Sequence, residues 1–310
     1  LLASCGKPET GEPKKTTLRF GHFPNITHVQ ALVAHQLSRQ GKGWYEERLG
    51  VDIEWYLYNA GPSATEAIFA RALDVTYIGP SPVLNAYAKS KGTEIRVLAG
   101  AANGGSALIV HPNSGIQSAA DLKGKKVATP QLGNTQDVQL RAYLKDNGYN
   151  ITQTGGDVFI LPTQNADQLA LFQRGDLDAA WTVEPWTTRL ELEAGAKVLV
   201  DDRETNVTLL ASSAAFVKEQ PELAAKLVAA HKELTQWIKD HPAEARELIK
   251  AELTELLKAA PKDDLINKAL SRIVVTDEVS RSSLDQMVVS AQKVGFLKDI
   301  PSLDQLFPKL

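Results

Sequence analysis

The chain has 310 residues, of which 43% are apolar and 23% charged, and its net charge is −3. At roughly 150 residues per domain this length predicts two globular domains, and 34 basic against 37 acidic residues argue against a nucleic-acid partner. A single cysteine excludes a disulfide framework and a cysteine-based zinc site. The six histidines show no metal-ligand spacing, so we expect no metal and no cofactor.

The single cysteine lies in a short motif at the start of the chain. Residues 2–5 read LASC and resemble the lipobox of bacterial lipoproteins, so residues 1–4 would end a signal peptide and Cys5 would be lipidated. Residues up to 16 are rich in proline, glycine and charge, as expected of a tether. The motif predicts a protein in the periplasm or on the outer face of the cytoplasmic membrane, anchored through Cys5. A free thiol is the alternative.

Beyond residue 16 short apolar segments alternate with amphipathic ones. We expect strands at 18–21, 51–58, 75–78, 95–100, 107–111, 126–129, 158–161 and 179–183. Helices are expected at 27–40, 64–72 (capped by Ser63), 83–91, 135–147 and 167–174, and over most of the chain from Pro221 onward. This alternation predicts βαβ units and mostly parallel sheets.

Two stretches of the sequence echo each other. Residues 69–80 (FARALDVTYIGP) and 172–185 (FQRGDLDAAWTVEP) both read as helix end, turn, strand and proline-containing loop. The echo indicates two similar α/β lobes, although βαβ units in general look alike. Because ligands bind beyond the carboxyl ends of parallel strands, two facing lobes would place four loops around one cleft. These loops are 22–28, 79–82, 130–136 and 182–186.

Three of these loops carry uncharged donors where a helix is expected to start. Helix N-termini attract anions, and none of the four loops contains Lys or Arg. The loops therefore predict capture of a small anion by amides and hydroxyls, with helix capping as the alternative. In the fourth loop, Trp186 would cover an apolar part of the ligand or pack in the core. Glu184 would meet a cationic ligand group or a residue across the cleft.

Motifs of catalysis are missing from the sequence. It contains no Gly-x-Ser-x-Gly elbow, no Walker loop and no Gly-x-Gly-x-x-Gly fingerprint, so we expect a binding protein and no catalytic residues.

Six segments in order resemble the substrate-binding proteins of ABC importers in the aliphatic sulfonate, taurine and nitrate group. They are residues 21–28 (GHFPNITH), 59–62 (NAGP), 78–82 (IGPSP), 121–125 (DLKGK), 131–137 (QLGNTQD) and 184–186 (EPW). The resemblance implies an α/β periplasmic-binding-protein fold of the second type. Lobe I would comprise 17–102 plus 208–310 and lobe II 103–207, joined by crossovers near 102–105 and 202–208.

The resemblance also implies a function and a ligand site. The protein would capture a small organic anion, an aliphatic sulfonate or taurine first, by hinge closure, act as a monomer and deliver the ligand to a membrane permease. Nitrate, bicarbonate and a heterocyclic vitamin precursor are alternative ligands, and an enzyme resembling a pyrimidine-precursor synthase or a sensor module are alternative functions. The implied ligand positions are Asn25, Thr27, His28, Gly79, Pro80, Ser81, Asn134, Thr135, Gln136, Glu184 and Trp186.

Overall fold

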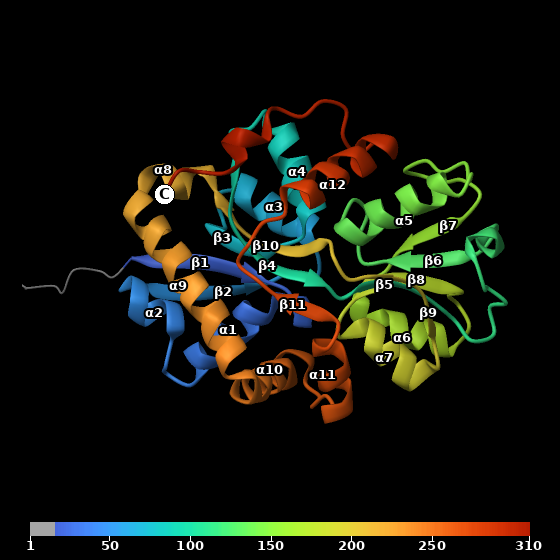
Figure 1. Ribbon diagram of the computed structural model, residues 1–310, viewed down its shortest axis with the longest axis horizontal. Helices are drawn as coiled ribbons and strands as arrows, with labels where there is room; N and C mark the ends of the chain where they lie inside the picture. Colours follow the sequence, from blue (N-terminus) through green and yellow to red (C-terminus); the bar gives the residue numbers. More distant parts are fainter. Residues whose placement is uncertain (1–15) are drawn as a thin grey trace, which may run out of the picture.

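The computed structural model describes residues 16–310 (Figure 1). The predicted signal-peptide end, the lipidated Cys5 and nearly all of the predicted tether lie outside this range. Within residues 16–310, no helix is both long and apolar enough to cross a bilayer.

Two β-sheets lie side by side and form the centre of the molecule (Figure 1). The six-stranded sheet has the order β11-β4-β10-β3-β1-β2, and the five-stranded sheet the order β7-β6-β8-β5-β9. The strands of the first are β1 (Thr17–His22), β2 (Asp52–Leu57), β3 (Val75–Ile78), β4 (Ile95–Gly104), β10 (Asn206–Ser213) and β11 (Ile273–Val275). Those of the second are β5 (Ser106–Val110), β6 (Lys126–Thr129), β7 (Phe159–Pro162), β8 (Ala179–Val183) and β9 (Lys197–Asp202).

Each sheet has a parallel part and an antiparallel part. β1 pairs in parallel with β2 and β3, and β6 with β7 and β8, as the βαβ pattern predicts. β10 runs antiparallel to β3 and β4, and β5 antiparallel to β8 and β9. The sheets are therefore less parallel than predicted. One reason is that β9 and β10 lie in a segment for which the sequence suggested no strand, and a second is that β5, which was predicted, enters its sheet antiparallel to β8.

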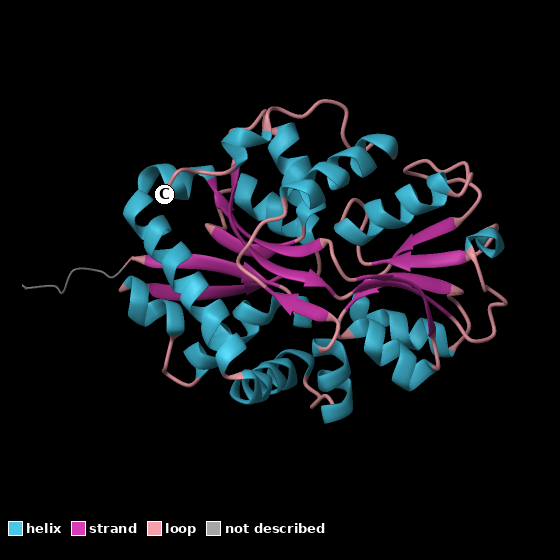
Figure 2. Cartoon of the chain, viewed as in Figure 1, coloured by secondary structure: helices cyan, strands magenta, loops and turns pink. Residues whose placement is uncertain are grey.

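Helices cover both faces of each sheet (Figure 2), so each half of the molecule has two apolar layers. On one face of the six-stranded sheet pack α1 (Val29–Arg39), α2 (Trp44–Leu49), α8 (Ala214–Glu219), α9 (Pro221–Asp240), α10 (Pro242–Leu257) and α11 (Asp263–Leu270). On its other face pack α3 (Gly61–Phe69), α4 (Pro80–Lys89), α12 (Arg281–Lys293) and the 3-10 turn η3 (Leu303–Leu306). The five-stranded sheet lies between α5 (Thr135–Asp146) with η2 (Ala119–Leu122) on one side and α6 (Asn165–Gln173) with α7 (Trp186–Ala194) on the other.

Two helices begin three residues earlier than predicted. α3 starts at Gly61 and α4 at Pro80, each with proline in its first turn. Proline fits there because the N–H that it lacks would have no partner inside the helix. The predicted cap at Ser63 is wrong, because Ser63 lies inside α3 and its hydroxyl hydrogen-bonds the side chain of Gln131.

The chain passes between the sheets twice, at Gly105 and at residues 203–205. Gly104 and Gly105 have φ of +75° and +71°, which favours glycine. A Cβ at Gly104 would lie only 2.6 Å from the carbonyl oxygen of Arg272, so a side chain does not fit at this crossing. The lobe boundaries at 102/103 and 207/208 stay a prediction, since β4 and β10 run across them.

His231 on α9 links that helix to the six-stranded sheet through two hydrogen bonds. Its Nδ1 lies 2.9 Å from the hydroxyl of Tyr77, and its Nε2 lies 2.8 Å from the carbonyl oxygen of Gly100. A neutral ring satisfies both, accepting from the tyrosine and donating to the carbonyl. Burial lowers the pKa of His231 to about 4.

This burial predicts a loss of stability in acid. The unfolded chain takes up a proton at an ordinary histidine pKa of about 6.5, whereas folded His231 does so only near pH 4. The free energy of unfolding therefore falls as pH drops from about 6.5 to 4, with a contribution of about 3 kcal/mol from this residue. Urea unfolding between pH 7 and pH 4 should show a smaller loss for His231→Gln than for the unmodified chain. Equal losses in both proteins would contradict the assignment.

Candidate functional site

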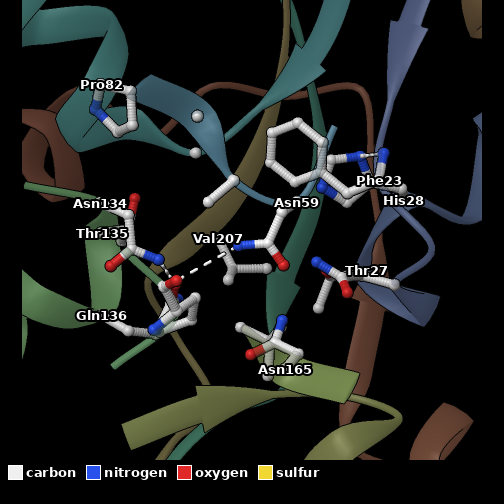
Figure 3. Close-up of a pocket in the computed structure, with 16 residues that line it drawn as sticks. Phe23, Thr27, His28, Asn59, Pro82, Asn134, Thr135, Gln136, Asn165 and Val207 are labelled. Carbon is white, nitrogen blue, oxygen red and sulfur yellow. Dashed lines mark hydrogen bonds between the residues drawn. The ribbon is translucent and has the colours of Figure 1, made fainter. Parts of the chain in front are cut away.

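A small cavity lies between the two sheets, partly open to solvent, with about 20 Å³ of space for the centres of water-sized molecules (Figure 3). Its wall comes from the carboxyl ends of β1, β2 and β3 on one side and of β6, β7 and β8 on the other, with Val207 at the start of β10. The wall residues are Phe23, Asn25, Thr27, His28, Asn59, Ala60, Gly61, Gly79, Pro82, Pro130, Asn134, Thr135, Gln136, Asn165, Val183 and Val207.

Five helices begin at this cavity. His28 precedes α1, Gly61 opens α3, Gly79 precedes α4, Asn134 caps α5 and Asn165 opens α6. Each of these helices has at least nine residues, and each brings roughly half a positive charge to its N-terminal end. Their convergence makes the cavity attractive to an anion.

Uncharged side chains supply the directed polar groups. Five carboxamides and two hydroxyls belong to the wall, and Figure 3 shows several of them around one common space. The amide nitrogens of Asn25 and Asn165 and the hydroxyl of Thr27 make no hydrogen bond to another described residue. A ligand that accepts hydrogen bonds would satisfy these donors.

His28 adds one more donor. Its Nδ1 accepts a hydrogen bond from the backbone N–H of Phe23 at 3.4 Å, so the proton of the neutral ring is on Nε2. Burial lowers the pKa of His28 well below 6.5, and the ring is therefore neutral at neutral pH. An anion at this position meets an N–H dipole rather than a positive charge.

Among the described residues, those of the cavity wall include no Asp, Glu, Lys or Arg. Charges lie behind the wall and are paired there. Asp137 accepts hydrogen bonds from Arg141 at 2.9 Å, from the backbone N–H of Gly133 at 2.9 Å and from Thr129 at 3.0 Å. This buried pair holds the loop that leads into α5, so the charges position the cavity wall without facing the ligand space.

Hydrogen bonds between the two halves close the cavity. Trp186 donates to the side-chain oxygen of Asn25 at 2.8 Å, the hydroxyl of Ser81 donates to Gly133 O at 3.2 Å, and Asn59 donates to Pro130 O at 3.2 Å. The first bond also orients Asn25, because it occupies the amide oxygen and leaves the nitrogen available. The described structure is therefore a closed arrangement of the two halves.

Gly79 marks the tightest approach between the halves. A Cβ at this position would lie 2.3 Å from the hydroxyl oxygen of Thr135, far inside contact distance. The backbone of Gly79 is extended, with φ of −72° and ψ of 156°, a conformation open to any residue. Glycine is required here by the closeness of the opposite half and not by backbone strain.

Glu184 is fully buried and pairs across the halves with Arg272, which precedes β11. Nη1 of Arg272 lies 2.9 Å from Glu184 Oε1 and 2.6 Å from Glu191 Oε2. Burial raises the pKa of Glu184, while Arg272 and the hydrogen bonds from Thr188 oppose that shift. The pairing gives Glu184 a partner outside the ligand space, the second of the two roles that the sequence left open for it.

Seven of the eleven predicted ligand positions belong to the cavity wall, and four do not. Those on the wall are Asn25, Thr27, His28, Gly79, Asn134, Thr135 and Gln136. Pro80 and Ser81 lie one step behind Gly79, and Glu184 and Trp186 contact residues of the opposite half. Ligand contact stays a prediction for all eleven residues, and Ser81, Glu184 and Trp186 also make contacts between the two halves.

Sequence reasoning missed two of the carboxamides, Asn59 and Asn165. Both follow a strand and stand next to a helix start, which is the signal that identified the other loops. In the sequence Asn59 belongs to the NAGP motif of a turn, and Asn165 lies between the predicted strand at 158–161 and the predicted helix at 167–174.

Two mixed sheets joined by two adjacent connections, with a polar cavity at the facing strand ends, define the periplasmic-binding-protein fold that the motifs implied. The chain belongs to the NMT1-like family, whose model matches residues 11–253.

The chain is similar in sequence or structure to several known binding proteins. A Bacillus subtilis (strain 168) relative named as an aliphatic sulfonates-binding protein is 26% identical over 91% of this chain and 83% of its own length. The taurine-binding periplasmic protein of Escherichia coli (strain K12) is 29% identical over 57% of this chain and 54% of its own length. The structure of the alkanesulfonate-binding protein SsuA from Xanthomonas axonopodis pv. citri, bound to MOPS, has a TM-score of 0.73 at 20% identity, covering 97% of this chain and 96% of that one.

Loss of the Glu184 partner should destabilise the protein. In Arg272→Met a buried carboxylate is left without its counterion, which typically costs about 3 to 5 kcal/mol. Urea unfolding should show this loss, and adding Glu184→Gln to Arg272→Met should restore part of it. Arg174→Met removes an exposed ion pair with Asp176 and serves as the control, with a change below about 1 kcal/mol. Equal effects of Arg272→Met and Arg174→Met would contradict the role of the buried pair.

Proposed function

We propose that the protein is the extracytoplasmic solute-binding component of an ABC importer and that it captures a small organic anion, an aliphatic sulfonate or taurine, by closure of its two halves. The observation that carries the proposal is a cavity at five helix starts whose wall, among the residues that the structure describes, bears uncharged donors and no ionised side chain. Family membership and the names of the relatives support the same class of ligand.

The chemistry of a sulfonate suits this wall. Its three oxygens spread one negative charge and accept several hydrogen bonds, which Thr27, Asn165 and His28 can donate. Helix dipoles supply the remaining attraction. Because no fixed counterion is present, release costs less than breaking an ion pair, as reversible capture requires.

The apolar part of the wall suits a short carbon chain. Phe23, Pro82, Pro130, Val183 and Val207 line the same cavity as the amides. An aliphatic tail would cover these side chains and gain about 25 cal/mol for each Å² of apolar surface removed from water.

Capture would couple binding to closure. A ligand stabilises the closed form only to the extent that it contacts both halves, and the wall contains donors from both. In the proposed cycle, lobe I (17–102 plus 208–310) and lobe II (103–207) rotate about the two connections, and the closed monomer docks on a membrane permease. The lipobox motif supports a lipid anchor through Cys5 and a place in the periplasm or on the outer face of the cytoplasmic membrane.

Ligand class can be tested by thermal melting of the full chain. Taurine and short alkanesulfonates should raise the melting temperature, since a ligand at 100 times its Kd stabilises the native state by about 2.7 kcal/mol. Nitrate, bicarbonate and a pyrimidine precursor test the alternatives, and an alkylamine of matched length is the control. Stabilisation by a panel member other than a sulfonate would reassign the ligand, and no stabilisation by any member would contradict the proposal.

Closure can be tested at Gly79. In Gly79→Ala the new methyl group would meet the Thr135 hydroxyl in the closed form but would leave the open form unstrained. Calorimetric titration should show affinity for the stabilising ligand reduced about 10-fold to 100-fold, which corresponds to an overpacking cost of roughly 1 to 3 kcal/mol. Gly155→Ala has nothing within 4 Å of its new Cβ and should bind normally. Unchanged affinity in Gly79→Ala would exclude the closed arrangement as the binding form.

A further inference from the structure

Three buried potential metal ligands meet behind the cavity wall. His22 ends β1, His35 lies on α1 and Glu252 lies on α10. Nε2 of His22 is 2.9 Å from Nδ1 of His35, which is 2.8 Å from Oε1 of Glu252. All three potential ligand atoms lie within 4.8 Å of one another, and the exposed fractions of the residues are 0%, 8% and 0%.

Hydrogen bonding alone leaves this cluster short of protons. Nδ1 of His22 lies 3.2 Å from the carbonyl oxygen of Phe23, a contact that is favourable only when this nitrogen carries the hydrogen. In the neutral ring Nε2 then presents a lone pair to the cluster. Oε1 of Glu252 presents another, beside the one that accepts from Nη2 of Arg39 at 3.4 Å. The single hydrogen that Nδ1 of His35 can carry therefore faces two acceptors, His22 Nε2 and Glu252 Oε1.

We propose that His22 Nε2, His35 Nδ1 and Glu252 Oε1 bind one divalent transition-metal ion, with zinc as the prime candidate. Such an ion accepts a lone pair from each of the three atoms and leaves the hydrogen of His35 on its Nε2. Two imidazoles and one carboxylate form a ligand set that zinc favours, with a further position for water. Two histidines thirteen positions apart on a strand and a helix, with a glutamate 217 positions further along the chain, have no recognisable ligand spacing. This is why the sequence led us to expect no metal.

The surroundings orient the three ligands as metal sites require. The far nitrogen of His22 is held by a backbone carbonyl, and the far oxygen of Glu252 accepts from Nε of Arg39 at 2.8 Å. The ring of His35 stacks on Trp55 with centroids 4.9 Å apart and an interplanar angle of 15°. Outer partners of this kind fix the rotamer and tautomer of metal ligands. Nη2 of Arg39 also donates a long hydrogen bond to the proposed ligand atom Oε1 of Glu252, at 3.4 Å, so the ion competes with this contact and the guanidinium charge lowers its affinity.

The position gives the ion a structural role. Phe23, which follows His22, lines the cavity, and its N–H contacts His28 on the same wall. An ion at His22 would tie the end of β1 to α1 and α10, directly behind this part of the wall. The proposed site does not depend on the class of ligand that the cavity binds.

Zinc uptake by the full chain tests the proposal directly. Protein stripped with a chelator and transferred to metal-free buffer should bind one equivalent of zinc chloride in calorimetric titration, with a rise in melting temperature. In His35→Gln the affinity should fall more than about 100-fold, beyond the effect of losing an outer partner. His241→Gln alters an exposed histidine that precedes α10 and should leave zinc uptake unchanged.

A second measurement covers the case in which His35→Gln fails to fold. In the unmodified chain labelled with nitrogen-15, one equivalent of zinc should shift the imidazole nitrogens of His22 and His35 but not those of His231. No stoichiometric uptake, the same affinity in His35→Gln, or shifts confined to other histidines would each overturn the proposal.

Discussion

The structure depends on one constraint, namely that the ligand cavity must offer electrostatic compensation to a bound group without leaving an unpaired buried charge when the cavity is empty. The cavity meets this constraint with dipoles: five helix starts and a set of amides and hydroxyls face it, and the described residues of its wall include no Asp, Glu, Lys or Arg. A lysine in the same place would need its own counterion whenever the ligand left. Uncharged donors need only water.

Ionised groups are used where they keep constant partners. Asp137 and Arg141 hold the loop before α5, and Arg272 joins Glu184 and Glu191 beneath the cavity. These pairs are buried and hydrogen-bonded on several sides. A substitution that removes one partner therefore leaves a buried charge without a counterion, which lowers the free energy of unfolding. These buried ion pairs thus position the cavity wall, and none of their charges faces the ligand space.

The sequence predicted the parts of the site that follow from local rules. The helix start at Asn134 and Thr135 could be predicted from the local pattern of residues. The order of the motifs predicted the family and the fold. The partners of Glu184 and Trp186 could not be predicted, because Arg272 and Asn25 lie far from them in the sequence. The starts of α3 and α4 were predicted three residues too late, because the prolines after β2 and β3 were expected in turns. Proline also occupies the first turn of helices, as it does here. The strand β10 is buried at every position. A strand buried on both faces does not show the alternation of apolar and polar residues by which a half-buried strand is predicted.

The proximity of Arg272 to Gly104 bears on how the two halves can separate. In any rotation, points next to the axis travel least, and the carbonyl oxygen of Arg272 is packed against the very glycine at which the chain changes sheets. In the proposed rotation the ion pair with Glu184 would lie near the axis, whereas bonds farther from it, such as that between Ser81 and Gly133, would part. A carboxylate near the rotation axis would stay paired and out of water while the two halves move. Opening of this kind would leave Glu184, one of the fully buried acidic residues, out of contact with water.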